Sequence, residues 1–118
     1  MYMKLEQIEI NDMGELEARL ATNKDVFVEV LEAPKRYKFF VAEPDNGRDY
    51  SLEELQKAVC GYIETVNVND NDRLLVCNEE GALLCFPTNW VSFDYCQKHS
   101  TPYVLFGNVL ITKKSRVL

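Results

Sequence analysis

The sequence of 118 residues has few of the side chains that build metal sites or pair a nucleophile with a base. It has one histidine, His99, and four well-separated cysteines: Cys60, Cys77, Cys85 and Cys96. Structural zinc ligands usually come in pairs about two to four residues apart, and a catalytic nucleophile needs a base beside it. We therefore expect no metal, no cofactor and no catalytic residue. We also expect His99 at the surface and the thiols reduced and buried.

Phosphate-binding and membrane-spanning patterns are also missing. The chain has five glycines and neither a Gly-x-Gly-x-x-Gly nor a phosphate-loop lysine motif. No apolar run approaches the roughly 18–20 residues of a membrane helix, and no signal peptide is visible. Acidic residues outnumber basic ones by 19 to 13, for a net charge of −6, which disfavours binding to phosphate backbones. We expect a cytoplasmic protein that binds neither nucleic acid nor membrane directly.

Apolar residues that recur with regular periods predict three elements in the first 42 residues. Residues 13–21 have helical spacing, and Asn11 or Asp12 can cap this helix. Residues 26–31 and 37–42 are short runs rich in β-branched and aromatic side chains, which is typical of strands.

The clearest local signal is a capping box, Ser51-Leu52-Glu53-Glu54. The serine oxygen can accept a bond from the third helical amide, and the glutamate can reach back to the serine amide. This predicts a helix over residues 51–60, followed by Gly61 as a left-handed C-terminal cap.

The second half of the chain predicts more strands and one short helix. Turn residues at 69–72 and 78–81 separate three apolar runs, which indicates a three-stranded antiparallel meander. A short helix and a long final strand, bent near Gly107, follow it. The predicted elements are strands 62–68, 73–77 and 82–86, helix 90–98 and strand 103–112.

Together these elements predict an α+β fold, an antiparallel sheet of about five to six strands with one main helix packed on a face. We expect an acidic N-terminal extension, residues 1–36, of one helix and one strand. Residues 37–118 form the main domain, and the two parts together make one compact unit.

Segments 52–64, 76–83, 87–89 and 107–111 carry motifs in a fixed order along the chain. Through these motifs, residues 37–112 resemble a small domain family of unknown function found in bacteria, phages and plasmids. The matching motifs occur in the family's order. The resemblance implies the α+β fold and a mobile-element context but no reaction. Cys60 stands where the family has the first glycine of a pair, and residues 1–36 lie outside the usual domain.

From this resemblance we expect a non-enzymatic binding protein of a phage or mobile element. It would inhibit or sequester a host protein or a host-defence signal, such as a small signalling molecule. The alternative is a small enzyme that uses tyrosine and glutamate side chains on a small-molecule substrate. The sequence leaves the oligomeric state open.

Polar side chains at the predicted strand ends are the candidates for contact with a ligand or partner. If they converge, they form a polar rim suited to amide or hydroxyl groups. The alternative is that Asn78 and Asn89 bond their own backbone and Glu64 is a solvated strand residue. The candidates are Tyr62, Glu64, Asn78, Glu79 and Asn89.

Residues 1–33 carry most of the net charge, with eight acidic side chains against three basic ones. Two interpretations stay open for this segment. It either extends the core with a helix and a strand, or presents an acidic surface to a basic, nucleic-acid-binding host protein.

Overall fold

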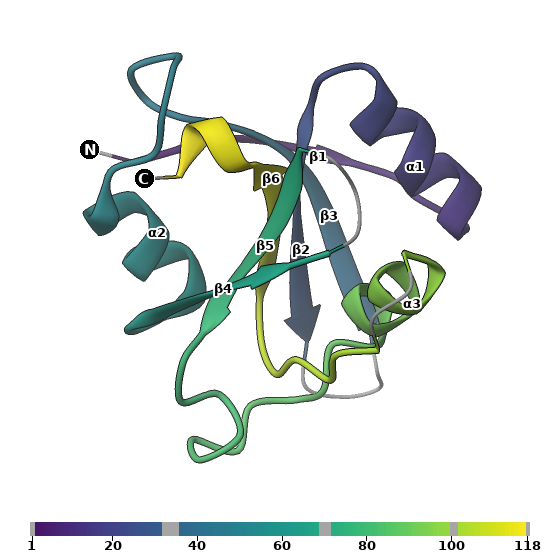
Figure 1. Ribbon diagram of the computed structural model, residues 1–118, viewed down its shortest axis with the longest axis vertical. Coiled ribbons are helices and arrows are strands. Elements are labelled where there is room, and N and C mark those ends of the chain that lie inside the picture. Colours follow the sequence, from purple (N-terminus) through teal and green to yellow (C-terminus); the bar gives the residue numbers. More distant parts are fainter. Residues whose placement is uncertain (1, 32–35, 69–71, 100–101, 118) are drawn as a thin grey trace.

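The computed structural model describes residues 2–31, 36–68, 72–99 and 102–117, and within them the chain forms three layers (Figure 1). No helix in these described ranges is long and apolar enough to cross a membrane. The elements, in chain order, are β1 (Lys4–Ile8), α1 (Met13–Ala21), β2 (Asp25–Leu31), β3 (Arg36–Glu43), α2 (Leu52–Val59), β4 (Ile63–Asn67), β5 (Arg73–Asn78), α3 (Trp90–Lys98), β6 (Val109–Lys113) and the 3₁₀ turn η1 (Lys114–Arg116).

The six strands found in the described residues form one antiparallel sheet, with the order β1-β3-β2-β6-β5-β4. The predicted α+β class is therefore confirmed. The central contact joins distant parts of the chain, because Phe27 of β2 lies opposite Leu110 of β6. Within residues 1–36, β1 and β2 are strands of this same sheet, and α1 packs on one of its faces.

Alternating side chains build a core on each face of the sheet. Val26 and Val28 of β2 face α1 and α3, whereas Phe27 faces α2. In β6, Ile111 faces α1 and α3, and Leu110 faces α2. Figure 1 shows α2 on one side of the sheet and both α1 and α3 on the other. Each fully buried side chain of this size stabilises the fold by about 1.5–3 kcal/mol. A shift of one residue would move every side chain of a strand to the opposite face, so this alternating pattern fixes the strand register.

The capping box that begins α2 is confirmed. Ser51 Oγ accepts from the Glu54 amide at 3.1 Å, and Glu54 Oε1 accepts from the Ser51 amide at 2.8 Å. The left-handed residue at the helix end, however, is Cys60 with φ 65°, so the assignment of this role to Gly61 is wrong. Gly61 is required for another reason, since a Cβ there would lie 2.8 Å from Asn78 Nδ2.

Helices α1 and α3 begin and end as predicted, and a side-chain oxygen caps each of them. Asp12 Oδ1 accepts from the Glu15 amide at 2.9 Å, and Asn89 Oδ1 accepts from the Ser92 amide at 2.9 Å. The bounds Met13–Ala21 and Trp90–Lys98 match the helices expected from the sequence.

The predicted three-stranded meander is wrong in its third strand. Residues 82–86 form no strand, and β5 pairs with β6 on its second edge. The Phe86 amide donates to the Gly81 carbonyl at 3.0 Å, which folds this run back on itself. The last strand is also shorter than predicted, because Gly107 bends the chain at φ 85° before β6 begins. Residues 69–71 of the predicted turn lie outside the described residues.

A buried charged cluster joins η1 to the body of the protein. Asp25 is fully buried and accepts hydrogen bonds from Tyr50 Oη at 2.7 Å and Arg116 Nη1 at 2.6 Å. Arg73 Nη1 lies 3.5 Å from the same carboxylate, and the Arg73 guanidinium also donates to the Leu20 carbonyl. The Tyr50 amide donates to the Arg116 carbonyl at 2.9 Å. Because removal of one partner leaves a buried charge unpaired, the cluster is structural.

Candidate functional site

Three of the five candidate residues lie together at one end of β4 and β5. The strands pair with Ile63 opposite Asn78, and the Glu79 amide donates to the Tyr62 carbonyl at 2.9 Å. Tyr62 is 66% exposed and Glu79 is exposed. Both side chains can therefore contact a partner from this end of the sheet.

Asn78 has a different environment, because its side chain is buried and holds the local backbone. Its Nδ2 donates to the Val59 carbonyl at 2.9 Å, and its Oδ1 accepts from the Glu80 amide at 2.7 Å. The side chain thus connects the end of α2 to the turn after β5. These two bonds fix the backbone before Tyr62, at Val59, and after Glu79, at Glu80.

Glu64 lies on the sheet face that α1 and α3 cover, because it alternates in step with Val66 and pairs with Cys77. Its side chain is exposed. Burial, followed by the nearby Glu64 carboxylate, raises the pKa of the Cys77 thiol to about 12. Cys77 is therefore protonated at neutral pH and is a poor nucleophile.

Asn89 belongs to another part of the molecule. It is fully buried, and besides capping α3 it donates from Nδ2 to the Gly107 carbonyl at 3.0 Å. The backbone amide of Asn89 donates to the Leu105 carbonyl at 2.8 Å. These bonds join α3 to the segment before β6, so the structure does not group Asn89 with Tyr62 and Glu79.

Three residues after Glu79, four consecutive exposed apolar residues begin in the segment between β5 and α3. We call Ala82-Leu83-Leu84-Cys85 the leucine loop. Leu83 is 81% exposed and Leu84 is 51% exposed. Figure 1 shows this segment projecting beyond the sheet. Single exposed apolar side chains are common, but a run of about three or four needs a functional reason.

The leucine loop is held in one shape by backbone bonds and close contacts. The Leu84 amide donates to the Glu80 carbonyl at 2.9 Å, and the Cys85 amide donates to the Ala82 carbonyl at 3.2 Å. A Cβ on Gly81 would lie 2.8 Å from the Phe106 carbonyl oxygen, so the base of the loop packs directly on that backbone.

Cys85 completes the loop in a left-handed conformation, with φ 59°. For a residue other than glycine this conformation costs about 1–2 kcal/mol. Strain of this kind is retained where the surroundings impose it, often at sites of function.

The thiols divide into two exposed and two buried groups, all of them free. Cys77 and Cys96 are buried as predicted, and burial raises the pKa of Cys96 to about 11. The prediction of burial is wrong for Cys60 and Cys85, which are exposed. Cys60 ends α2, and Cys85 lies on the leucine loop, so neither side chain has a core to enter.

His99 is also placed differently from the expectation. Its Nε2 lies 2.8 Å from Glu17 Oε1, and its ring centroid lies 4.5 Å from that of Tyr95. The side chain is 20% exposed, so His99 bridges α3 and α1 instead of lying free at the surface. Within the described ranges, no group of three or more histidine, cysteine or acidic residues is arranged to hold a metal ion.

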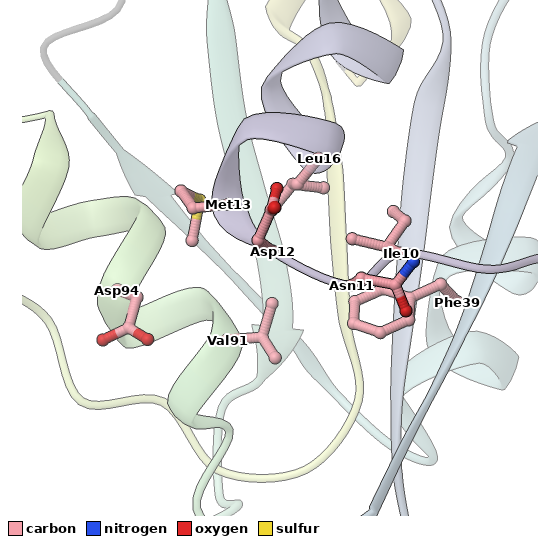
Figure 2. Close-up of a pocket in the computed structure, with 8 residues that line it drawn as sticks. All are labelled: Ile10, Asn11, Asp12, Met13, Leu16, Phe39, Val91 and Asp94. Atoms are coloured by element: carbon pink, nitrogen blue, oxygen red, sulfur yellow. The ribbon is translucent and has the colours of Figure 1, made fainter.

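A crevice of about 200 Å³ lies between the start of α1 and α3. Figure 2 shows Met13 and Val91 on one side of it and Phe39 on the other. Asp12 and Asp94 are its acidic residues, and Asp12 already caps α1. Its eight lining residues contain no cysteine, histidine, lysine, serine or tyrosine, so they offer no pair for nucleophilic catalysis.

A second groove, of about 270 Å³, lies between α2 and the N-terminal segment and is more apolar. Lys57 Nζ lies 3.7 Å from the centroid of the Tyr2 ring, which closes one side of it. Met3, Leu5 and Phe27 supply much of its apolar lining. This arrangement can accommodate an apolar group, but it brings none of the five candidate residues together.

The fold defines a small α+β domain, a six-stranded antiparallel sheet in the described residues with helices on both faces. A family model, described as a domain of unknown function (DUF3846), matches residues 28–116, and the chain belongs to this family. The match confirms the resemblance to a family of unknown function. No curated protein matches the chain, and no solved structure matches it.

Sequence reasoning missed the leucine loop because it interpreted residues 82–86 as a strand. A signal was present, since this short apolar run has no polar alternation and lies between Gly81 and Pro87. A run without alternation can be a buried strand or an exposed loop, and only the tertiary structure distinguishes the two.

Proposed function

We propose that this domain is a non-enzymatic binding protein that docks on a host protein through the leucine loop. The observation that carries the proposal is the exposure of four consecutive apolar residues on a loop held in one shape. The matching surface on the partner is an apolar pocket. The mobile-element context implied by the family resemblance makes a host factor, inhibited or sequestered by this contact, the expected target.

Apolar burial supplies the main binding energy in this proposal. Full burial of Leu83 and Leu84 contributes about 1.5–3 kcal/mol each. Association itself costs about 4–15 kcal/mol, so two leucines alone do not suffice. Tyr62, an exposed aromatic residue bonded through its carbonyl to the Glu79 amide, is the third contact in this proposal, since tyrosines are frequent among the residues that dominate binding. The fixed loop conformation lowers the ordering penalty on binding.

Charge supports a partner with a basic rim around its apolar pocket. Glu79 and Glu80 precede the leucine loop and are exposed, and the chain as a whole carries −6. Complementary charges around an apolar centre raise the association rate and select the partner. The acidic N-terminal residues add to this field without making the contact themselves.

The test is affinity capture from a bacterial host lysate, followed by binding measurements with the captured protein. Leu83→Ala combined with Leu84→Ala should weaken binding at least about thirtyfold, because about 2 kcal/mol or more of apolar burial is lost. Leu52→Ala is the matched control, since Leu52 is 58% exposed on α2. Equal affinity of the loop variant and the control variant would refute the proposed surface.

Salt dependence and Glu64 separate this proposal from its alternatives. Binding through the leucine loop should persist in high salt with a slower association rate, whereas docking by the acidic N-terminal segment should weaken steeply. A small signalling molecule would bind without any protein partner. In a small enzyme, Glu64→Gln would abolish turnover and spare binding, and detection of such turnover would overturn the binder proposal.

A further inference from the structure

Strand β1 forms one edge of the sheet and is almost wholly exposed. It pairs with β3 on one side, and the sheet order gives it no second neighbour among the described residues. Lys4, Leu5, Glu6 and Gln7 are all exposed, and Leu5 is 45% exposed. An edge of this kind presents unpaired backbone groups that a further strand can bond.

Lys4 and Glu6 carry opposite charges two positions apart, on the same face of β1. Leu5 lies between them on the other face, the α2 face, because it pairs with Ala42 of the α2 core. A lone charge on an edge strand normally blocks pairing with another chain. Two opposite charges at this spacing repel a second strand in some registers and attract it in others, so the register determines whether the pairing is stable.

Only a few registers are open to two copies that pair antiparallel about a two-fold axis. Residues that lie opposite each other must both point their backbone N–H and C=O groups the same way, either into the new pairing or away from it. The two-fold axis therefore passes midway between the two copies of one residue, which lie opposite each other. An axis at Lys4 puts two lysines face to face, and an axis at Glu6 does the same with two glutamates. Like charges directly opposite each other destabilise a sheet.

An axis at Leu5 removes both conflicts. It places Leu5 opposite the partner's Leu5, and each Lys4 opposite the partner's Glu6. Met3 then faces the partner's Gln7. The pairing therefore combines one apolar contact with two ion pairs, and it covers a leucine side chain that is 45% exposed in the single chain.

We propose that two copies of this chain pair through β1 in this register, which makes one continuous antiparallel sheet from the two six-stranded sheets. Charge complementarity selects a second copy as the occupant of the edge. A contact of about five residues per strand is small compared with stable interfaces of about 1,200–2,000 Å², so the dimer is weak and depends on concentration. This association goes beyond the proposed docking function and uses a different part of the molecule.

Sedimentation equilibrium over a range of protein concentrations tests the pairing with charge reversals. The wild-type chain should dimerise reversibly, and higher salt should weaken it. Lys4→Glu and Glu6→Lys should each weaken dimerisation about tenfold or more, because each turns two attractive pairs into repulsive ones. The control is Lys98→Glu, the same charge change at an exposed position on α3, which should leave the dimer unchanged.

The double variant distinguishes the registers, because swapping the two charges restores both ion pairs with the axis at Leu5 but leaves like charges face to face with the axis at Lys4 or Glu6. An equimolar mixture of Lys4→Glu and Glu6→Lys should form heterodimers, and the double variant should regain the homodimer. Circular dichroism of each variant should match the wild type, since both positions are exposed. A wild-type chain that stays monomeric near 1 mM (about a thousandfold above a micromolar dissociation constant) would overturn the proposal. Failure of the mixture to associate while the wild type dimerises would also overturn it.

Discussion

Replacement of Asp25 by alanine tests whether the buried charged cluster holds the C-terminal turn in place. The carboxylate is fully buried and contacts the side chains of Tyr50, Arg73 and Arg116 at 2.7, 3.5 and 2.6 Å. Its removal leaves Arg73, whose side chain is 8% exposed, without a counter-charge. Loss of one partner from a buried ion pair costs about 3–5 kcal/mol. A domain has about 5–15 kcal/mol of stability in total, so the loss is a large fraction.

The assay is urea unfolding followed by tryptophan fluorescence, compared across variants with unchanged m-values. Tyr50→Phe removes one hydrogen bond to a charged group and should cost about 1.5–3 kcal/mol, which is less than Asp25→Ala. Arg116→Ala should cost less still, because its side chain is 20% exposed and the charge that it leaves behind retains Arg73. If Asp25→Ala costs less than about 1 kcal/mol, or no more than Tyr50→Phe, the inference that the cluster is structural is refuted.

Four further measurements test local features. Cys60→Gly should stabilise the protein by about 1 kcal/mol, because glycine adopts φ 65° without strain; an unchanged urea midpoint would contradict this. Gly81→Ala should destabilise the protein and weaken partner binding, because its Cβ would lie 2.8 Å from a backbone carbonyl; a full-affinity variant would show that the base of the loop can shift. Burial, followed by the Asp25 charge, raises the pKa of Tyr50, so this stability is present below the unfolded value of about 10 and is lost as pH rises above it; Tyr50→Phe should flatten that loss. A thiol reagent at neutral pH should modify two cysteines quickly in the folded protein and the buried Cys77 only on unfolding; four equal rates would contradict the burial.

Local sequence signals predicted the elements whose ends depend on neighbouring residues. The Ser51–Glu54 capping box and the oxygen of Asp12 act on amides only three positions away, so the sequence alone locates the starts of α2 and α1. The same holds for α3, although its cap, Asn89, was selected as a binding candidate and not as a cap. Short-range bonds leave a pattern that can be read before the fold is known.

The errors came from features that only distant contacts decide. Residues 82–86 and β5 are both short apolar runs, but β5 is buried between two cores whereas Leu83 and Leu84 reach solvent. The neighbour of β5 is β6, over 30 residues further along the chain, and nothing in the intervening sequence indicates that pairing. Hydrophobic pattern identifies what can be buried, and topology determines what is buried.

Of the two proposed surfaces, one lies inside the segment matched by the family model and the other lies outside it. The leucine loop falls within residues 28–116, whereas β1 precedes the match. The proposed docking surface therefore lies inside the segment that the family model covers, whereas the proposed pairing uses a strand outside it. A charge reversal at Lys4 should weaken dimerisation without changing the intrinsic affinity of each loop for its partner. It should lower only the apparent affinity for an immobilised, clustered partner, because a dimer presents two loops and gains from effective concentration. Equal binding of the Lys4→Glu variant and the wild type to both sparse and dense partner surfaces would show that dimerisation has no part in docking.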